Sequence, residues 1–214
     1  MDQICINQLD ADERGEQVTN ISRIFQAASE VVVWLGTAAD GSDRVMDVWT
    51  QIGAMAQQFD VEEHRSRRNQ HQALDHTAVE TKPQDSTAMQ FESIIDQTLQ
   101  LPDRRTLNAI VAWEKRRWFS RVWVVQEYAL SKEAIVMCGK KTLLTTTAES
   151  GRELFVEAVK RLPPDLLSIC LPLFQDPMHV FAITRAARRP SNDGKIGSHT
   201  LYELLRLLFT NNHV

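Results

Sequence analysis

The chain has 214 residues, of which 43% are hydrophobic, and its formal net charge is −4. This length and composition suffice for one good-sized domain with a hydrophobic core, or for a domain with an appendage. No block of Lys and Arg is long enough, or rich enough in aromatic residues, to indicate a nucleic-acid surface. We therefore expect a soluble globular protein without a nucleic-acid partner.

The cysteines and the apolar runs indicate where the protein works. Cys5, Cys138 and Cys170 are odd in number and far apart, and two of them lie inside apolar runs, which is typical of reduced core residues. No apolar run approaches the roughly 20 residues that are needed to cross a bilayer. We expect a cytoplasmic protein with no membrane span.

The first part of the chain has the pattern of a parallel βαβ unit. Met1–Ile6 is strand-like, and Asp10 with Glu13 resembles a capping box that opens a helix over about Asp12–Ala28. Val31–Leu35 is a continuous apolar run with many β-branched residues, which favours a buried strand.

A long amphipathic helix and a polar segment follow. Ser42 can cap a helix whose apolar positions keep the helical period as far as Phe59. Residues 61–88 are rich in charged and amide side chains and have few large aliphatic ones, which is too little apolar surface to offset the ordering entropy. We predict a disordered or loosely helical insertion at 61–88 within a single partial domain that covers 1–214.

The second half of the chain is mainly helical. Helices broken at Pro102 lead to a further strand at Ala134–Cys138, and a turn at Lys140-Lys141 can form a short hairpin. Later elements are a helix capped within Thr145–Thr147 and ended by Pro163-Pro164, a broken apolar segment over Leu166–Phe174, and helices opened by Pro177 and Ser198.

These elements predict an α/β fold with an incomplete parallel, flavodoxin-like sheet that is flanked by many helices. The predicted strands are Met1–Ile6, Val31–Leu35 and Ala134–Cys138. Three strands among about eight helices are few for a complete sheet, so we expect part of the domain to be missing from this chain.

The stretch from Arg116 to Gly139 is the most informative one. If it is helical at first, Trp123, Gln126, Glu127 and Leu130 share one face, because they lie at i, i+3, i+4 and i+7. This arrangement places the carboxylate of Glu127 on the stripe that should face the core. On physical grounds, an interior ion pair of Glu127 with Arg121 or Arg117 explains this placement at least as well as a catalytic role does.

Other candidate groups have simpler interpretations. Trp113, Trp118 and Trp123 fit core anchors better than a stacking platform. Ser120 or Cys138 as a nucleophile would need a His partner that the sequence does not identify. The sequence spacing of His64, His71 and His76 does not place them on one helix face, so we predict no metal site.

Several separated blocks of the sequence carry a further pattern. Their residues are Asp2, Cys5, Asn7, Gln8, Trp34, Gly36, Trp118, Arg121, Trp123, Gln126 and Glu127, followed by Cys138-Gly139. In this order they resemble the heterokaryon incompatibility (HET) domain of filamentous fungi. The elements that normally precede the first block and the family's closing motif are absent, and Arg117 departs from the usual pattern. The chain therefore looks like a HET domain trimmed at both ends.

The resemblance implies a role in fungal non-self recognition, an innate-immunity function. In this family, fusion of genetically unlike cells triggers programmed cell death, with the HET domain as the effector. Such a module would work through protein partners or through self-association.

HET domains are also distantly similar to Toll/interleukin-1 receptor (TIR) domains, which implies a TIR-like sheet. Trp123 and Glu127 resemble the Trp and Glu of a TIR helix, and in TIR domains that cleave NAD the matching Glu is catalytic. The alternative function that this implies is NAD glycohydrolase, with Glu127 catalytic, Trp123 supporting and NAD as the substrate, and with no other cofactor.

Overall fold

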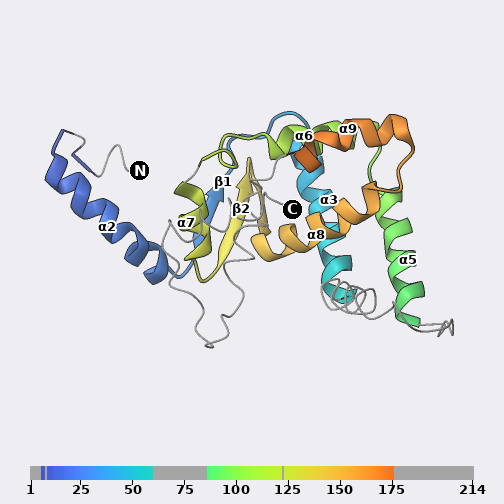
Figure 1. Ribbon diagram of the computed structural model, residues 1–214, viewed down its shortest axis with the longest axis horizontal. Coiled ribbons are helices and arrows are strands. Elements are labelled where there is room, and N and C mark those ends of the chain that lie inside the picture. Colours follow the sequence, from blue (N-terminus) through green and yellow to red (C-terminus); the bar gives the residue numbers. More distant parts are fainter. Residues whose placement is uncertain (1–5, 8, 60–85, 122, 176–214) are drawn as a thin grey trace, which may run out of the picture. The chain divides into compact units, whose positions relative to one another are not determined.

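The computed structural model describes residues 6–7, 9–59, 86–121 and 123–175 (Figure 1). The chain divides into two compact units, which we describe separately. Unit 1 comprises residues 1–34, 117–135 and 177–214, and unit 2 comprises residues 35–116 and 136–176.

The described strands form one three-stranded sheet in the order β1-β2-β3. The strands are β1 (Val31–Trp34), β2 (Ala134–Cys138) and β3 (Lys141–Leu144). The pairing of β1 with β2 is parallel, and β3 returns after a two-residue turn, so the sheet is mixed. The predicted α/β fold and the predicted hairpin are thus confirmed, although the turn lies at Gly139-Lys140 and Lys141 already belongs to β3. The predicted strand at Met1–Ile6 lies, except for its last residue, outside the described residues.

The described part of unit 2 is built mainly from helices. They are α3 (Ser42–Phe59), α5 (Ser86–Gln100), α6 (Arg104–Glu114), α8 (Thr145–Val159) and α9 (Pro164–Gln175). Helix α3 packs along α8 and also contacts α6, while α5 contacts α8 and α6 contacts α9 (Figure 1). The predicted helix that ends at Phe59 is confirmed, as its apolar period indicates. Ser42, however, is its first residue rather than its cap, and its hydroxyl accepts from the N–H of Ala39 at 3.1 Å.

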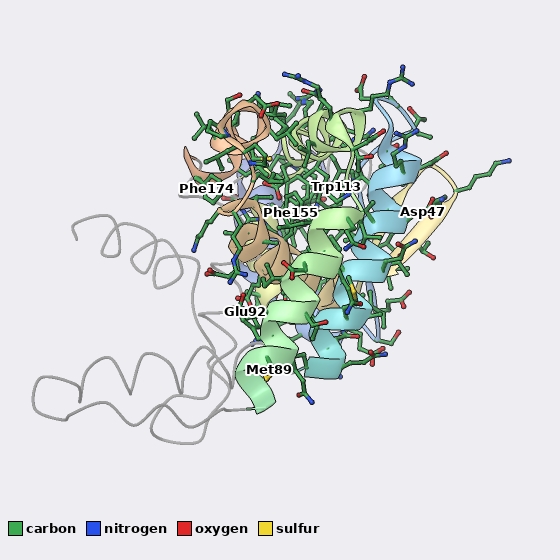
Figure 2. All side chains as sticks on the ribbon, turned by 90° about the vertical axis from the view of Figure 1, so that its right-hand side faces the viewer. Asp47, Met89, Glu92, Trp113, Phe155 and Phe174 are labelled. Carbon is green, nitrogen blue, oxygen red and sulfur yellow. The ribbon has the colours of Figure 1, made fainter. Side chains whose placement is uncertain are left out.

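The core of unit 2 is centred on aromatic side chains. The ring of Trp49 lies 5.3 Å from that of Phe155, edge to face, and 6.2 Å from that of Trp113. Figure 2 shows Trp113 and Phe155 inside the helical unit, with Met89 at its exposed margin. Large aliphatic residues complete the core: Met46, Ile52, Ile95, Leu107, Ile110 and Leu154.

One ion pair is buried beside this core. The Nε of Arg152 on α8 lies 2.9 Å from the Oε1 of Glu114 on α6, and the two side chains are only 14% and 8% exposed. The Nη2 of Arg152 also donates to the carbonyl oxygen of Leu173 on α9 at 3.4 Å. This one guanidinium therefore connects three helices.

In unit 1, helix α2 (Ala11–Ala27) contacts helix α7 (Trp123–Ala129). The Asp10 carboxylate caps α2 by accepting from the N–H groups of Asp12 and Glu13, both at 3.0 Å. This confirms the predicted cap. The Glu13 carboxylate does not close a capping box, because it accepts instead from the N–H of Asn7 at 3.2 Å.

Three boundaries differ from the predictions. The predicted insertion at 61–88 lies outside the described residues up to 85, but Ser86–Ala88 are the first turn of α5. The predicted broken segment over Leu166–Phe174 is wrong, because Pro164 opens a continuous helix α9 that tolerates Pro172 inside it. The N-cap of α8 is Leu144, with no side-chain hydrogen bond, rather than one of the threonines.

Candidate functional site

An aromatic cluster anchors the segment that carries the predicted catalytic residue. Trp118 and Phe119 are buried, and their rings lie 5.2 Å apart, edge to face. Tyr128 on α7 is fully buried, with its ring 6.4 Å from that of Trp118. Such contacts fix the short helix α7 against the preceding turn, and they confirm Trp118 as a core anchor.

The buried face of α7 differs from the predicted one. Val124 and Tyr128, at i and i+4, are fully buried, whereas Glu127 and Leu130 are only half-buried. The helical segment contains two i, i+4 pairs that are one residue apart, Trp123 with Glu127 and Val124 with Tyr128. The pair that includes the large Tyr ring faces the core. Glu127 therefore lies at the margin of the buried face, where part of its side chain meets solvent.

The structure describes the other predicted residues of this stretch only in part. Trp123 and Gln126 belong to α7, but their side chains are outside the described part of the chain. Arg121 and Arg117, the two candidate ion-pair partners of Glu127, are both exposed. The prediction of an ion pair and the prediction of catalysis both stand as predictions.

The first predicted block is described only in part. Asp2, Cys5 and Gln8 lie outside the described residues. Asn7 is exposed, and its Oδ1 accepts from the N–H of Leu9 at 3.1 Å. Together with its N–H contact to Glu13, this gives Asn7 a role in starting α2.

Trp34 and Gly36 flank the carboxyl end of β1. The Trp34 side chain is 49% exposed, so it does not belong to the core that the described residues form. Gly36 has a φ of +99°, a conformation that side-chain-bearing residues rarely adopt. Its carbonyl oxygen accepts from the N–H of Gly139 at 2.9 Å, which joins the two residues, both in unit 2, that follow β1 and β2.

Arg116 is the residue that sequence reasoning missed. Its guanidinium donates to the carbonyl oxygens of Leu35 at 2.7 Å, Thr37 at 3.0 Å and Ala39 at 3.1 Å. A single planar cation thus holds the whole loop that follows β1. Nothing in the sequence distinguishes Arg116 from its exposed neighbour Arg117, because the contacts reach about 80 positions back along the chain.

For the remaining candidate residues, the described part of the structure shows no arrangement of a nucleophile with a base and no set of metal ligands. Cys138 and Cys170 are buried free thiols, and the hydroxyl of Ser120 donates to the carbonyl oxygen of Arg117 at 3.0 Å. Among the described residues no group of His, Cys and carboxylate side chains could hold a metal ion. The three predicted non-ligand histidines, His64, His71 and His76, are outside those residues. No described helix has both the length and the apolar character to cross a bilayer.

Comparison with known proteins identifies the family. The family model described as "Heterokaryon incompatibility protein (HET)" matches residues 1–127. The chain is 33% identical over 143 residues to "Heterokaryon incompatibility protein 6, OR allele" of Neurospora crassa. That match covers 67% of this chain and 20% of the relative, so the chain spans about a fifth of the relative's length. No solved structure matches the chain significantly. The chain belongs to the heterokaryon incompatibility (HET) family.

Proposed function

We propose that the chain is a HET module that acts in the cytoplasm of fungal cells in non-self recognition. In this proposal, fusion of genetically unlike cells engages the module, and the module triggers programmed cell death. The observation that carries the proposal is the match of the family model to residues 1–127, together with the name of the relative in Neurospora crassa.

A module of this kind needs a surface for a protein partner or for self-association. Helix α9 presents Leu171, 46% exposed, and Phe174, 41% exposed, one turn apart. Two large apolar side chains side by side on an outer helix face are a typical anchor of a protein contact. They support the view that the module works by binding a protein.

A second candidate function is cleavage of NAD, with Glu127 as the catalytic carboxylate and Trp123 as its support. The observation that favours it is the place of Glu127 at the margin of the buried face of α7, where it is half-buried and still reachable. A carboxylate held in this way can stabilise the positive charge that develops on the nicotinamide ribose as the glycosidic bond breaks.

Expression of the chain in a filamentous fungus tests the first function. We expect induction to cause cell death, scored by a viability stain, in cells that express the chain at the level of an inert control protein. Gly53→Leu serves as an unfolded control, because a side chain there would collide with Thr147. Viable cells that contain the folded chain, or equal killing by the Gly53→Leu variant, would contradict the proposal.

A further inference from the structure

A hollow of about 440 Å³ lies in unit 2, between the start of α3 and one face of α6. The α3 side contributes Asp40, Gly41 and Arg44. The α6 side contributes Arg105, Asn108, Ala109 and Ala112, which lie at i, i+3, i+4 and i+7 and so share one helix face. This volume falls in the range of pockets that bind small molecules.

The α3 wall of the hollow begins in the loop that follows β1 along the chain. Asp40 and Gly41 end this loop. The three hydrogen bonds from Arg116 hold this loop, so the α3 wall of the hollow is shaped before any ligand arrives.

The loop makes its turn in an unusual conformation. Asp40 has a φ of +54° and Gly41 a φ of +76°, so two successive residues are left-handed. A Cβ at Gly41 would come within 3.0 Å of the Cβ of Ala109, which shows how closely the two walls approach at the floor. The hollow lies beside this close contact and is lined there by the small side chains of Ala109 and Ala112.

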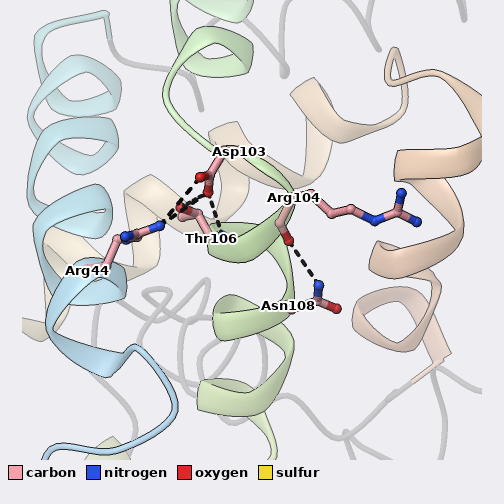
Figure 3. Close-up of polar contacts among 5 residues, drawn as sticks. All are labelled: Arg44, Asp103, Arg104, Thr106 and Asn108. Carbon is pink, nitrogen blue, oxygen red and sulfur yellow. Dashed lines mark hydrogen bonds and ion pairs between the residues drawn. The ribbon is translucent and has the colours of Figure 1, made fainter.

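Arg44, a lining residue, has a partner in Asp103, which does not itself line the hollow. The carboxylate of Asp103 caps α6, accepting from the Thr106 hydroxyl at 2.6 Å and the Thr106 N–H at 2.8 Å (Figure 3). These two hydrogen bonds hold the pKa of Asp103 below its usual range. Arg44 reaches the same carboxylate only at 3.4 Å, and its side chain is 52% exposed. Because charge-assisted hydrogen bonds are normally shorter, Arg44 can turn toward a ligand at little cost.

We propose that this hollow binds a small organic anion, in which a carboxylate or phosphate group meets Arg44 and Arg105 and an apolar body rests on Gly41, Ala109 and Ala112. Guanidinium groups suit planar carboxylates and phosphates because they donate two parallel hydrogen bonds. The lining of the hollow does not include Glu127, so this proposal does not depend on the proposed function.

Calorimetric titration with benzoate, phenyl phosphate and inorganic phosphate tests the site, with benzyl alcohol as the uncharged control. We expect saturable binding of the two aromatic anions and none of benzyl alcohol. The double variant Arg44→Gln/Arg105→Gln should weaken binding of the aromatic anions by at least about tenfold, because both charge-assisted contacts are lost. No saturable binding to the native chain at up to about 10 mM of either anion would overturn the proposal.

Arg104→Gln is the matched control for charge. Arg104 neighbours Arg105 on α6, but its side chain points away from Arg44 and does not line the hollow (Figure 3). This variant should change the affinity less than about twofold, because its charge is distant and screened. An equal loss in Arg104→Gln would show that the anions respond to general charge and would overturn the proposal.

Two further variants test the volume of the hollow and its preference for a negatively charged ligand. Ala112→Leu should fill the hollow and weaken benzoate and phenyl phosphate by at least about tenfold without changing the melting temperature. Asp40→Asn keeps a residue that tolerates a positive φ and removes a repelling charge, so anion affinity should rise. Unchanged affinity in the first variant, or weaker binding in the second, would contradict the proposed ligand class.

Discussion

Glu127 lies half-buried on α7, beside the fully buried Tyr128. On the NAD-cleaving alternative, we expect Glu127→Gln to abolish both NAD consumption and cell death with nearly unchanged melting temperature. The amide keeps the size and most of the hydrogen-bonding geometry of the carboxylate. On the ion-pair alternative, the same change removes a contact to Arg117 or Arg121. Because both are exposed, it should lower the free energy of unfolding by no more than about 1 kcal/mol.

Glu133→Gln is the control for the measurements on Glu127, because Glu133 is an exposed residue that belongs to the same unit. It should leave NAD consumption, killing and melting temperature as they are in the native chain. A Glu127→Gln protein that melts far lower, or that still kills at normal melting temperature, would end the catalytic interpretation.

Arg116 and Arg117 form a natural pair for a stability test. Arg116→Gln removes the guanidinium that donates to Leu35, Thr37 and Ala39, so we expect a loss of about 2 kcal/mol in the free energy of unfolding. Arg117→Gln changes an exposed side chain and should stay within about 0.5 kcal/mol of the native value. Urea denaturation measures both, and equal losses would show that the three-carbonyl contact contributes little.

The interface between α3 and α8 depends on glycine. A Cβ at Gly53 would lie 2.3 Å from the carbonyl oxygen of Thr147, and a Cβ at Gly151 would lie 3.0 Å from the backbone N of Gly53. Two helix backbones that approach this closely leave no space for any side chain at the contact. The sequence contains no sign of this need, because neither glycine ends a helix or sits in a turn.

A pair of alanine substitutions measures that interface. Gly53→Ala should destabilise unit 2 by about 2 to 3 kcal/mol, because backbone atoms of α8 must move away. Gly15→Ala, inside α2, meets nothing within 4 Å and should stabilise the chain by up to about 1 kcal/mol through helix propensity. Thermal melting of the two variants decides, and a shift of the same sign in both would contradict the packing argument.

The elements that the sequence predicted well are those with local signals. Helix α3 follows its apolar period from Ser42 to Phe59, and α2 and α6 begin after the carboxylate caps Asp10 and Asp103. Prediction failed at α9, because Pro172 suggested a break in a segment that tertiary contacts keep helical. Local propensity is a weak signal when packing opposes it.

Stability of the whole molecule should depend on alkaline pH through one buried thiol. Burial, and to a smaller extent the charge of the nearby Glu114, raise the pKa of Cys170 from 9.0 to about 11. Below about pH 9 the thiol is protonated in both states. Between pH 9 and about 11 only the unfolded thiol ionises, so the free energy of unfolding falls by no more than about 3 kcal/mol as the pH rises.

Urea denaturation from pH 8 to 11 of the native chain and of Cys170→Ala measures this dependence. The variant loses buried volume and is less stable throughout, but its stability should fall less over the window. Other groups titrate equally in both proteins, so the difference between the two curves isolates the thiol. Parallel curves would show that Cys170 ionises normally in the folded chain.

By itself, the sequence determined most of the described helices and strands, with α9 as the exception, and the family to which the chain belongs. These properties rest on residues a few positions apart, such as the cap at Asp10, the apolar run at the second predicted strand, and the order of separated motif blocks. Only the tertiary structure decided that Arg116 holds the loop after β1, and that Tyr128 rather than Glu127 faces the core. It also decided that α3 and α6 enclose a hollow with Arg44 at its rim. These features join residues distant in sequence, and no local pattern encodes which distant partner a side chain will meet.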